Sequence, residues 1–262
     1  MEIKAKKSLG QNFLIDKNII EKISSVTKIT NREILEVGPG TGNLTSSLLL
    51  KKPKKIFAFE KDQKLCSLLL SKFNNQIEIK NADILKSDLN QLSKDKLIVF
   101  GNLPYNISTE IICSWIINLK KEAWFDELIL MFQKEVAERI ISEENSSNYG
   151  RLTILCKWRL NVEKIFDISP NCFFPKPKVE SSVLHFTLKH NYNHFKNPKN
   201  LELVSRIFFN QRRKMIKRPM KQLFENFLYV SKKLDLDLEM RPQNISLDQY
   251  FKIVNEYEKL GS

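Results

Sequence analysis

Short apolar stretches alternate with longer stretches of helical periodicity through the first half of the chain. Apolar runs that stop at glycine or polar residues predict strands, and apolar residues spaced by three and four predict helices. Residues 97–100 are wholly apolar, which is typical of a central strand buried on both faces. The predicted strands are 33–37, 55–60, 76–80, 97–100 and 127–132, and the predicted helices are 13–29, 44–50, 61–73 and 110–119.

This alternation predicts an α/β fold built on a doubly wound parallel sheet. Residues 160–168 and 182–188 predict two further strands, and only a proline-rich loop joins them, so we expect an antiparallel pair. From residue 190 onward the pattern predicts helices alone, after a polar stretch typical of a linker. We therefore expect two domains, residues 1–189 with the sheet and residues 190–262 as a small all-helical domain.

The first predicted strand runs into a glycine-rich loop, EVGPGTG at residues 36–42. Glycines at such a turn let the backbone pass close to a ligand. The spacing departs from the Gly-x-Gly-x-x-Gly fingerprint that places a pyrophosphate on a helix N-terminus. Glu36 would also repel phosphate, whereas a carboxylate suits a ligand with an ammonium or sulfonium group. The loop alone is a weak signal, and a nicotinamide or flavin site is the alternative.

Two further acids stand where later predicted strands end. Glu60 closes the second strand, where a carboxylate can accept hydrogen bonds from both hydroxyls of a ribose. Asp83 follows the third strand, where it can accept from an adenine amino group. Either acid singly could be a solvated turn residue. Because both follow consecutive strands, they and the glycine loop together predict a site for an adenosine that carries no phosphate.

The run Asn102-Leu103-Pro104-Tyr105 directly follows the fourth predicted strand. The exocyclic amine of a base is a poor nucleophile, because its lone pair is delocalised into the ring. The side-chain oxygen of Asn102 and the backbone carbonyl of Leu103 can accept hydrogen bonds from that amine and aim its lone pair. Pro104 fixes the turn, and Tyr105 offers a ring for the base to stack on. The run predicts methylation of a base amine, with a plain tight turn as the alternative.

The charge of the chain favours a polyanionic partner. Lys and Arg number 43 against 30 Asp and Glu, which leaves a net charge of +13. Nucleic acid is the leading candidate, an anionic membrane surface the second, and a generally lysine-rich composition the alternative. The four cysteines form no Cys-x-x-Cys pair, so we expect no metal site. No apolar run could span a bilayer and no signal peptide is evident, so we expect a soluble, cytoplasmic protein.

Several segments resemble motifs of the ribosomal RNA adenine N6-dimethyltransferases. The Asn-Leu-Pro-Tyr run preceded by a glycine loop is one of them. The others are SLGQNFL at residues 8–14, FFPKPKV at residues 173–179, NQRRK at residues 210–214 and RPQNIS at residues 241–246. The match covers nearly the whole chain in the same order, and it is closest to the small-subunit branch of the family.

The resemblance implies a Rossmann-like class I methyltransferase fold with S-adenosylmethionine as the methyl donor. It assigns Asn102, Leu103 and Tyr105 to the target adenine, with Phe173 on the other face of the base. Because Phe174 is also aromatic, it is the alternative stacking ring. The residues that the resemblance assigns to the cofactor site are Asn12, Leu14, Gly38, Glu60, Asp83 and Asn102.

The activity implied is dimethylation of two adjacent adenines near the 3′ end of 16S rRNA, within the immature small ribosomal subunit. We expect a monomer, because no exposed apolar pattern demands a partner. The alternatives are a 23S rRNA adenine methyltransferase of the macrolide-resistance type and a non-catalytic ribosome assembly factor. The two C-terminal motifs argue against the first, and intact Glu60, Asp83 and Asn102 argue against the second.

A basic segment lies within the predicted helical domain. No acid stands between Glu202 and Glu225, and apolar residues interleave at helical spacing. One face of the helix would then pack against the protein, and the basic face would contact the phosphates of a nucleic acid. The alternative is an ordinary solvated helix face. The basic residues are Arg206, Arg212, Arg213, Lys214, Lys217, Arg218 and Lys221.

Overall fold

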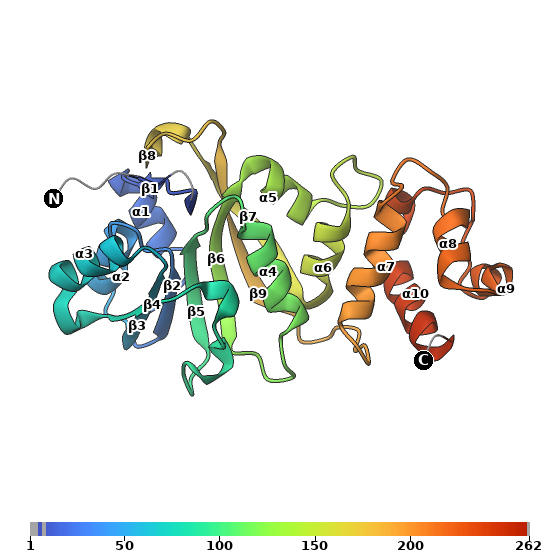
Figure 1. Cartoon of the computed structure of the whole chain (residues 1–262), viewed down its shortest axis with the longest axis horizontal. Coiled ribbons are helices and arrows are strands. Elements are labelled where there is room, and N and C mark those ends of the chain that lie inside the picture. Colours follow the sequence, from blue (N-terminus) through green and yellow to red (C-terminus); the bar gives the residue numbers. More distant parts are fainter. Residues whose placement is uncertain (1–4, 7–8, 261–262) are drawn as a thin grey trace. The chain divides into compact units, whose positions relative to one another are not determined.

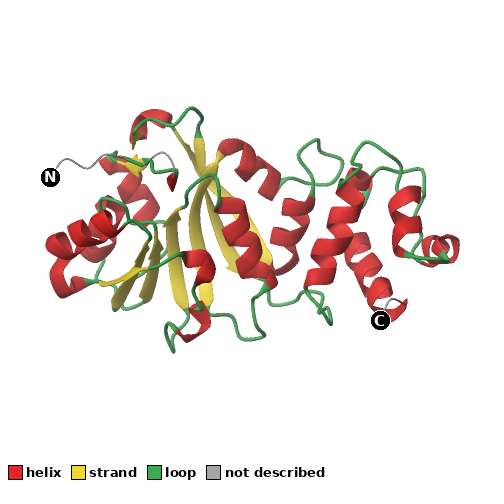
Figure 2. Ribbon diagram, in the orientation of Figure 1, coloured by secondary structure: helices red, strands yellow, loops and turns green. Residues whose placement is uncertain are grey.

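The computed structural model describes residues 5, 6 and 9–260, which divide into two compact units. The first unit comprises the residues up to Ser114, together with Leu119–Ala137 and Val162–Leu188. The second comprises Trp115–Asn118, Glu138–Asn161 and the residues from Lys189 onward. The first unit contains the sheet and the second is almost wholly helical (Figures 1 and 2). The expected boundary between two domains, at residues 189 and 190, stays a prediction.

A seven-stranded sheet forms the centre of the first unit, in the order β4-β3-β2-β5-β6-β9-β7 (Figure 1). Neighbours from β4 to β6 are parallel, and β9 is antiparallel to β6. The order along the chain reverses between β2 and β5, which is where open α/β sheets bind ligands. The strands are β2 (Glu33–Val37), β3 (Lys55–Glu60), β4 (Glu78–Asn81), β5 (Leu97–Asn102), β6 (Phe125–Gln133), β7 (Leu160–Ile168) and β9 (Ser181–Leu188).

The central strands are buried, as their apolar sequences predict. Ile34 and Leu35 of β2 are 0% exposed, and so are Ile98 and Val99 of β5. A parallel strand covered on both faces has no solvent side, so its sequence shows a continuous apolar run rather than alternation. The doubly wound α/β fold predicted from the sequence is therefore confirmed, with an antiparallel strand added at one side.

The helices of the sheet-containing part begin at recognisable signals. Asp16 accepts a hydrogen bond from the backbone N–H of Ile19 at 3.0 Å, and Asp62 accepts one from Lys64 at 3.0 Å, so each caps a helix N-terminus. The helices are α1 (Lys17–Ser24), α2 (Asn43–Leu50), α3 (Gln63–Phe73), α4 (Ser108–Ile117) and α5 (Lys134–Ile141), with short 3-10 turns at Asn74–Gln76, Ile84–Lys86, Leu89–Gln91 and Pro170–Cys172.

The helix predicted over residues 13–29 is wrong at both ends. Helix α1 starts only after the Asp16 cap, and Phe13 and Leu14 form a short strand, β1. This strand pairs antiparallel with β8 (Phe173–Phe174) in a separate two-stranded ribbon. Phe13 lies opposite Phe174, and Leu14 lies opposite Phe173. The ribbon therefore brings two of the motifs into contact, although they are far apart in the sequence.

The second unit packs helices around aromatic side chains. Tyr250 is 0% exposed, its ring lies 5.4 Å from that of Phe208, and its hydroxyl donates to the Pro242 carbonyl at 2.8 Å. The helices are α6 (Arg151–Arg159), α7 (Lys199–Phe209), α8 (Lys217–Leu223), α9 (Phe227–Lys233) and α10 (Leu247–Leu260), with a 3-10 turn at Pro242–Asn244. Among the described residues, none of the helices has the length and apolar character that crossing a membrane requires.

Candidate active site

One pocket opens at the carboxyl edge of the parallel strands, at the reversal point between β2 and β5. Its lining comes from every strand end that the sequence singled out and from the segment before β1. All the residues assigned to the cofactor line this pocket, namely Asn12, Leu14, Gly38, Glu60, Asp83 and Asn102. Leu103 and Tyr105 line it as well, so the predicted donor and acceptor residues share one cavity.

The glycine loop passes close to the end of β5. Gly38 has a φ of +69°, and a Cβ there would lie 3.3 Å from the backbone oxygen of Asn102. Gly40 has a φ of +58°, and a Cβ there would lie 2.8 Å from the Phe13 ring. Both positions need glycine for conformation and for space. The loop can therefore lie between the Asn-Leu-Pro-Tyr turn and the segment around β1.

Glu60 is fixed by the backbone of its neighbours. One carboxylate oxygen accepts from the N–H of Asp62 at 2.9 Å, and the other accepts from the N–H of Gly40 at 3.2 Å. Burial raises the pKa of Glu60, and these backbone donors oppose that shift. The backbone of Lys61 acts in the same direction, and because a carboxylate has four acceptor positions, Glu60 keeps capacity to accept from a ligand. This geometry suits a pair of ribose hydroxyls.

Glu36 is the most deeply buried acid of the pocket lining. Its side chain is 1% exposed, and its Oε2 atom has no hydrogen-bond partner in the described structure. Burial raises the pKa of Glu36 to about 7, with repulsion from Glu60 adding to the shift. Contacts with Thr45 oppose this shift, but the buried Oε2 atom is left without a partner, and an approaching cation would stabilise its charge. This observation fits a ligand that carries a positive charge.

Asp83 has prior partners on both oxygens. One oxygen caps the following turn by accepting from the N–H of Leu85 at 3.1 Å, and the other pairs with Lys61 at 2.9 Å. The ion pair with Lys61 lowers the pKa of Asp83, so the group is an anionic acceptor at neutral pH. An amino group of a ligand would share Asp83 with Lys61, whose side chain is 58% exposed and can move.

The Asn102 amide is oriented by the N-terminal segment. Its Nδ2 donates to the backbone carbonyl of Asn12 at 2.8 Å, so its oxygen is the end left to accept from a ligand. The Leu103 side chain is 1% exposed and packs under Gly101, where a Cβ would lie 2.9 Å from Leu103 Cδ2. The buried side chain anchors the backbone whose carbonyl the sequence singled out.

Of the aromatic residues, Tyr105 lies in the pocket and Phe173 does not. The Tyr105 hydroxyl shares a hydrogen bond with Ser181, which fixes the ring. Phe173 is 2% exposed and packs in the hydrophobic core with Leu14, outside the pocket lining. Phe174, by contrast, is 62% exposed. The structure thus separates the two candidate rings by burial.

Further residues of the site were not predicted. Asn43 donates to the Leu14 carbonyl at 2.8 Å, and Lys72 donates to the Thr41 carbonyl at 3.1 Å, so both hold the loops around the pocket. Asp62 joins Glu60 to the N-terminal segment. Its position at the start of a helix is an N-cap signal in the sequence, but nothing in the sequence reveals its distant partners.

The doubly wound sheet, with its acid-lined pocket at the reversal point between β2 and β5, is that of a class I methyltransferase. A sequence model described as "Ribosomal RNA adenine dimethylase" matches residues 2–259. The chain is 60% identical over 260 residues to the "Ribosomal RNA small subunit methyltransferase A" of Pelagibacter ubique, and this covers 99% of each chain. It is 39% identical over 248 residues to the protein of the same name from Mycoplasma mobile, covering 94% of this chain and 95% of that one.

Solved structures agree with this result. A dimethyladenosine transferase from Plasmodium falciparum matches with a TM-score of 0.79 and 28% identity, over 95% of this chain and 98% of that one. The 23S rRNA methyltransferase ErmE matches with a TM-score of 0.69 and 20% identity, over 95% of this chain and 100% of that one, which shows the shared fold alone. The chain belongs to the ribosomal RNA adenine dimethylase family. It is an adenine methyltransferase that uses S-adenosylmethionine and acts on ribosomal RNA.

Proposed function

We propose that this enzyme dimethylates N6 of two adjacent adenines near the 3′ end of 16S rRNA. Two relatives, 60% and 39% identical, are named for the small ribosomal subunit, which supports that RNA as the substrate. The observation that carries the proposal is the shared cavity, in which the turn at Asn102 meets the acid-lined pocket. The rival that acts on 23S rRNA is supported by fold similarity alone.

On the donor side, we assign each polar group to one part of the cofactor. Glu60 accepts the ribose hydroxyls with the free acceptor positions of its two oxygens, and Asp83 accepts the adenine amine. Gly38 lets the backbone approach the ligand, and Asn12 and Leu14 complete the wall of the pocket. The buried carboxylate of Glu36 favours a cationic ligand over a neutral one. When bound, S-adenosylmethionine supplies an electrophilic methyl group on a sulfonium.

On the acceptor side, Asn102 and Leu103 prepare the amine of the target adenine. The side-chain oxygen of Asn102 and the carbonyl of Leu103 each accept an N–H of the amine, which localises its lone pair away from those two bonds. No strong general base is needed, because methylation makes the nitrogen acidic and its proton can pass to water. The contribution of the protein is preorganised electrostatics. After the first transfer the site must admit a bulkier methylamine.

We propose that the target base stacks on Tyr105, with Phe173 as the ring on its other face. Phe173 belongs to the β1–β8 ribbon and its side chain is buried in the core, so this role requires the ribbon to shift when RNA binds. Phe174 is the alternative, because its ring is already exposed in the same ribbon. Substitution of each ring in turn distinguishes these two arrangements.

The basic segment of the second unit is the proposed RNA-contacting surface, within residues 190–262. Arg212 is half-buried, and it donates to Gln243 at 3.3 Å and to the Ser146 carbonyl at 3.3 Å, so it holds the unit together. The remaining basic residues are exposed and suit phosphate contacts, namely Arg206, Arg213, Lys214, Lys217, Arg218 and Lys221. We propose that a monomer binds the immature small subunit through them, in the cytoplasm where ribosomes assemble.

Methyl incorporation from labelled donor into purified ribosomal particles tests the proposal. Small subunits from a strain whose 16S rRNA lacks the two dimethylated adenines should be methylated, whereas mature small subunits and large subunits should remain unlabelled. A second arm uses free 16S rRNA, which should be a poorer acceptor than the immature particle. Labelling of large subunits instead of small ones would overturn the substrate assignment.

A further inference from the structure

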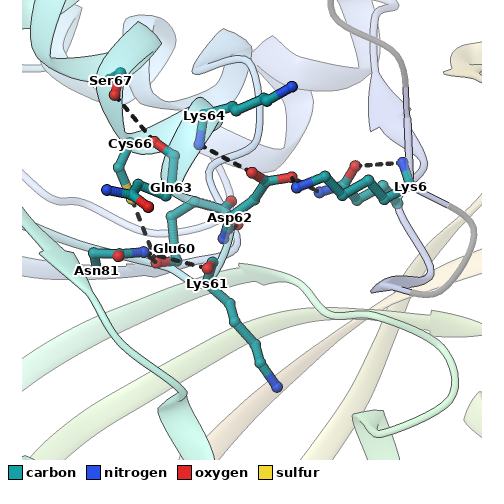
Figure 3. A network of polar contacts seen from close by, with 10 residues as sticks. Lys6, Glu60, Lys61, Asp62, Gln63, Lys64, Cys66, Ser67 and Asn81 are labelled. Carbon is teal, nitrogen blue, oxygen red and sulfur yellow. Dashed lines mark hydrogen bonds and ion pairs between the residues drawn. The ribbon is translucent and has the colours of Figure 1, made fainter.

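Asp62 joins the donor pocket to the N-terminal segment through a single carboxylate. Its side chain is 4% exposed, and it lies two residues after Glu60, at the start of α3. One oxygen, Oδ1, accepts from the backbone N–H of Lys64 at 3.0 Å. The other oxygen, Oδ2, accepts from Lys6 Nζ at 2.8 Å (Figure 3). It also accepts from Gln11 Nε2 at 3.2 Å. The first bond belongs to the helix cap, and the other two reach a distant part of the chain.

The two N-terminal partners are also bonded to each other. The backbone N–H of Lys6 donates to Gln11 Oε1 at 2.7 Å, and the N–H of Leu9 donates to the Lys6 carbonyl at 3.0 Å. Gln11 therefore uses its oxygen on the segment and its nitrogen on Asp62. Lys6 and Gln11 are thus bonded to each other, and both donate to the same oxygen atom of Asp62. We call this arrangement of Lys6, Gln11 and Asp62 the clasp.

The part of the chain that the clasp restrains is a wall of the pocket. Leu9, Gly10, Gln11 and Asn12 all line the cavity. Gly10 has a φ of +63°, and a Cβ there would lie 3.1 Å from Asn106 Oδ1, so the segment passes close over the acceptor turn. At its end, the Asn12 carbonyl accepts from the Asn102 amide. Residues 9–12 thus extend from the acids of the pocket assigned to the methyl donor to Asn102, which is assigned to the methyl acceptor.

The clasp also contacts the donor side directly. The backbone N–H of Asp62 donates to Glu60 at 2.9 Å, so Glu60, Asp62 and the segment form a continuous chain of hydrogen bonds (Figure 3). Burial acts to raise the pKa of Asp62, but the bonds from Lys6 and Gln11 outweigh it and hold this pKa below its usual range. The buried carboxylate of Asp62 depends on the hydrogen bonds from Lys6 and Gln11 to offset its loss of water. Removal of either side chain leaves the buried charge with too few hydrogen bonds.

We propose that Asp62 is a positioning residue, which through Lys6 and Gln11 holds residues 9–12 at the donor pocket and thereby sets both donor residence and the orientation of the Asn102 amide. This inference rests on the assigned donor site. Opening of the clasp would uncover one wall of the pocket, so donor exchange should be limited by the strength of the ion pair between Lys6 and Asp62. Because Lys6 is 44% exposed, added salt should weaken the clasp.

The test compares Lys6→Gln, Asp62→Asn and the double variant with Lys64→Gln as a matched control. Lys64 is an exposed lysine at the start of the same helix, and only its backbone contacts Asp62. Asn at position 62 can still cap the helix, so Asp62→Asn removes the ion pair while keeping the cap. Dissociation of S-adenosylmethionine is measured in the absence of RNA, by stopped-flow displacement with S-adenosylhomocysteine.

We expect each single variant to release S-adenosylmethionine about 5- to 20-fold faster than the wild type does. The double variant should release it no faster than the more strongly affected single variant. The wild-type rate should rise with salt, and the rate for Lys6→Gln should not. Hydrogen exchange of residues 9–12 should rise in step with release, while Lys64→Gln behaves as wild type. Unchanged release in Lys6→Gln, or additive effects in the double variant, would overturn the clasp.

Two checks separate other failures from failure of the clasp. If Asp62→Asn unfolds, Lys6→Gln carries the test alone, because it changes an exposed group at the edge of the fold. If the wild type does not bind S-adenosylmethionine at all, the donor assignment fails rather than the clasp. A KM for RNA that is unchanged in both variants, with a raised KM for donor, supports positioning at the donor side.

Discussion

The acid-lined pocket of the first unit and the basic segment of the second unit use charge in opposite ways. In the pocket, the carboxylates of Glu36 and Glu60 are almost fully buried, and Glu60 is bonded to backbone N–H groups. In the basic segment, residues such as Arg213 and Lys214 are exposed. Buried and fixed charges are weakly screened by salt, whereas exposed charges are strongly screened. The contacts of Glu36 and Glu60 with the methyl donor should therefore depend little on salt, so that salt acts on donor binding through the exposed Lys6 of the clasp, whereas RNA binding should depend strongly on salt.

The largest expected effect concerns Asn102, where donor and acceptor meet. Asn102→Ala removes the oxygen that prepares the amine, so methyl incorporation at saturating donor should fall by about 100- to 1,000-fold. Donor affinity, measured by calorimetry, should change far less, because the pocket acids remain. Asn102→Asp serves as the comparison. It keeps a side-chain oxygen that can accept a hydrogen bond, but it loses the N–H group that donates to the Asn12 carbonyl. Equal incorporation by wild type and Asn102→Ala would refute the acceptor role.

The second effect concerns the exposed charges alone. Replacing Arg213, Lys214 and Lys217 by Gln should weaken binding to small subunits by about 10- to 100-fold at physiological salt. The slope of log affinity against log salt should fall by about two, and donor affinity should stay constant. The matched control removes the same charge from three exposed lysines elsewhere, Lys52, Lys94 and Lys121. An unchanged slope in the first variant would rule out phosphate contacts by these residues.

A third effect distinguishes the two aromatic rings beside the pocket. Phe173→Leu keeps most of the buried volume but removes the ring, and Phe174→Leu does the same at an exposed position. If Phe173 stacks on the target, only the first variant should raise the KM for RNA, by about 5- to 100-fold. Thermal unfolding of both variants checks that the loss is not one of stability. A raised KM in Phe174→Leu alone would assign the stacking to the exposed ring.

The smallest effect is a pH dependence that belongs to Glu36. Its pKa is raised to about 7 in the described pocket, so it is protonated below that pH and ionised above it. A cationic donor favours the ionised carboxylate, so donor affinity should rise by up to about tenfold between pH 6 and pH 8. Glu36→Gln should bind more weakly at pH 8 and lose this dependence. An identical pH profile in wild type and Glu36→Gln would exclude Glu36 as the cause.

The strands and the site residues that depend on local sequence pattern were predictable from the sequence. The strands at 33–37 and 55–60 match β2 and β3, because buried parallel strands leave a continuous apolar run. The residues that end those strands follow from the topology, since the carboxyl ends of parallel strands share one edge. For this reason the glycine loop, Glu60 and Asp83 are predictable from the sequence as one site, and they lie together in one pocket.

The parts that the sequence did not predict depend on distant contacts. Strand β1 is two residues long and exists through its pairing with β8, so it has no periodicity of its own. Helix α6 is buried on nearly every side, so its apolar residues do not show the amphipathic spacing that marks a surface helix. The burial of Phe173 and the clasp at Asp62 likewise require partners remote in the chain.

Mass spectrometry of the 3′-terminal fragment of 16S rRNA tests the central claim most directly. Small subunits whose 16S rRNA is unmethylated at these adenines are mixed with large subunits and incubated with the enzyme and S-adenosylmethionine, and the fragment is isolated by nuclease digestion. We predict two adjacent dimethylated adenines, four methyl groups in all, with no methylation in a parallel reaction with Asn102→Ala. A fragment that remains unmethylated, while 23S rRNA in the same mixture gains methyl groups, would contradict the account.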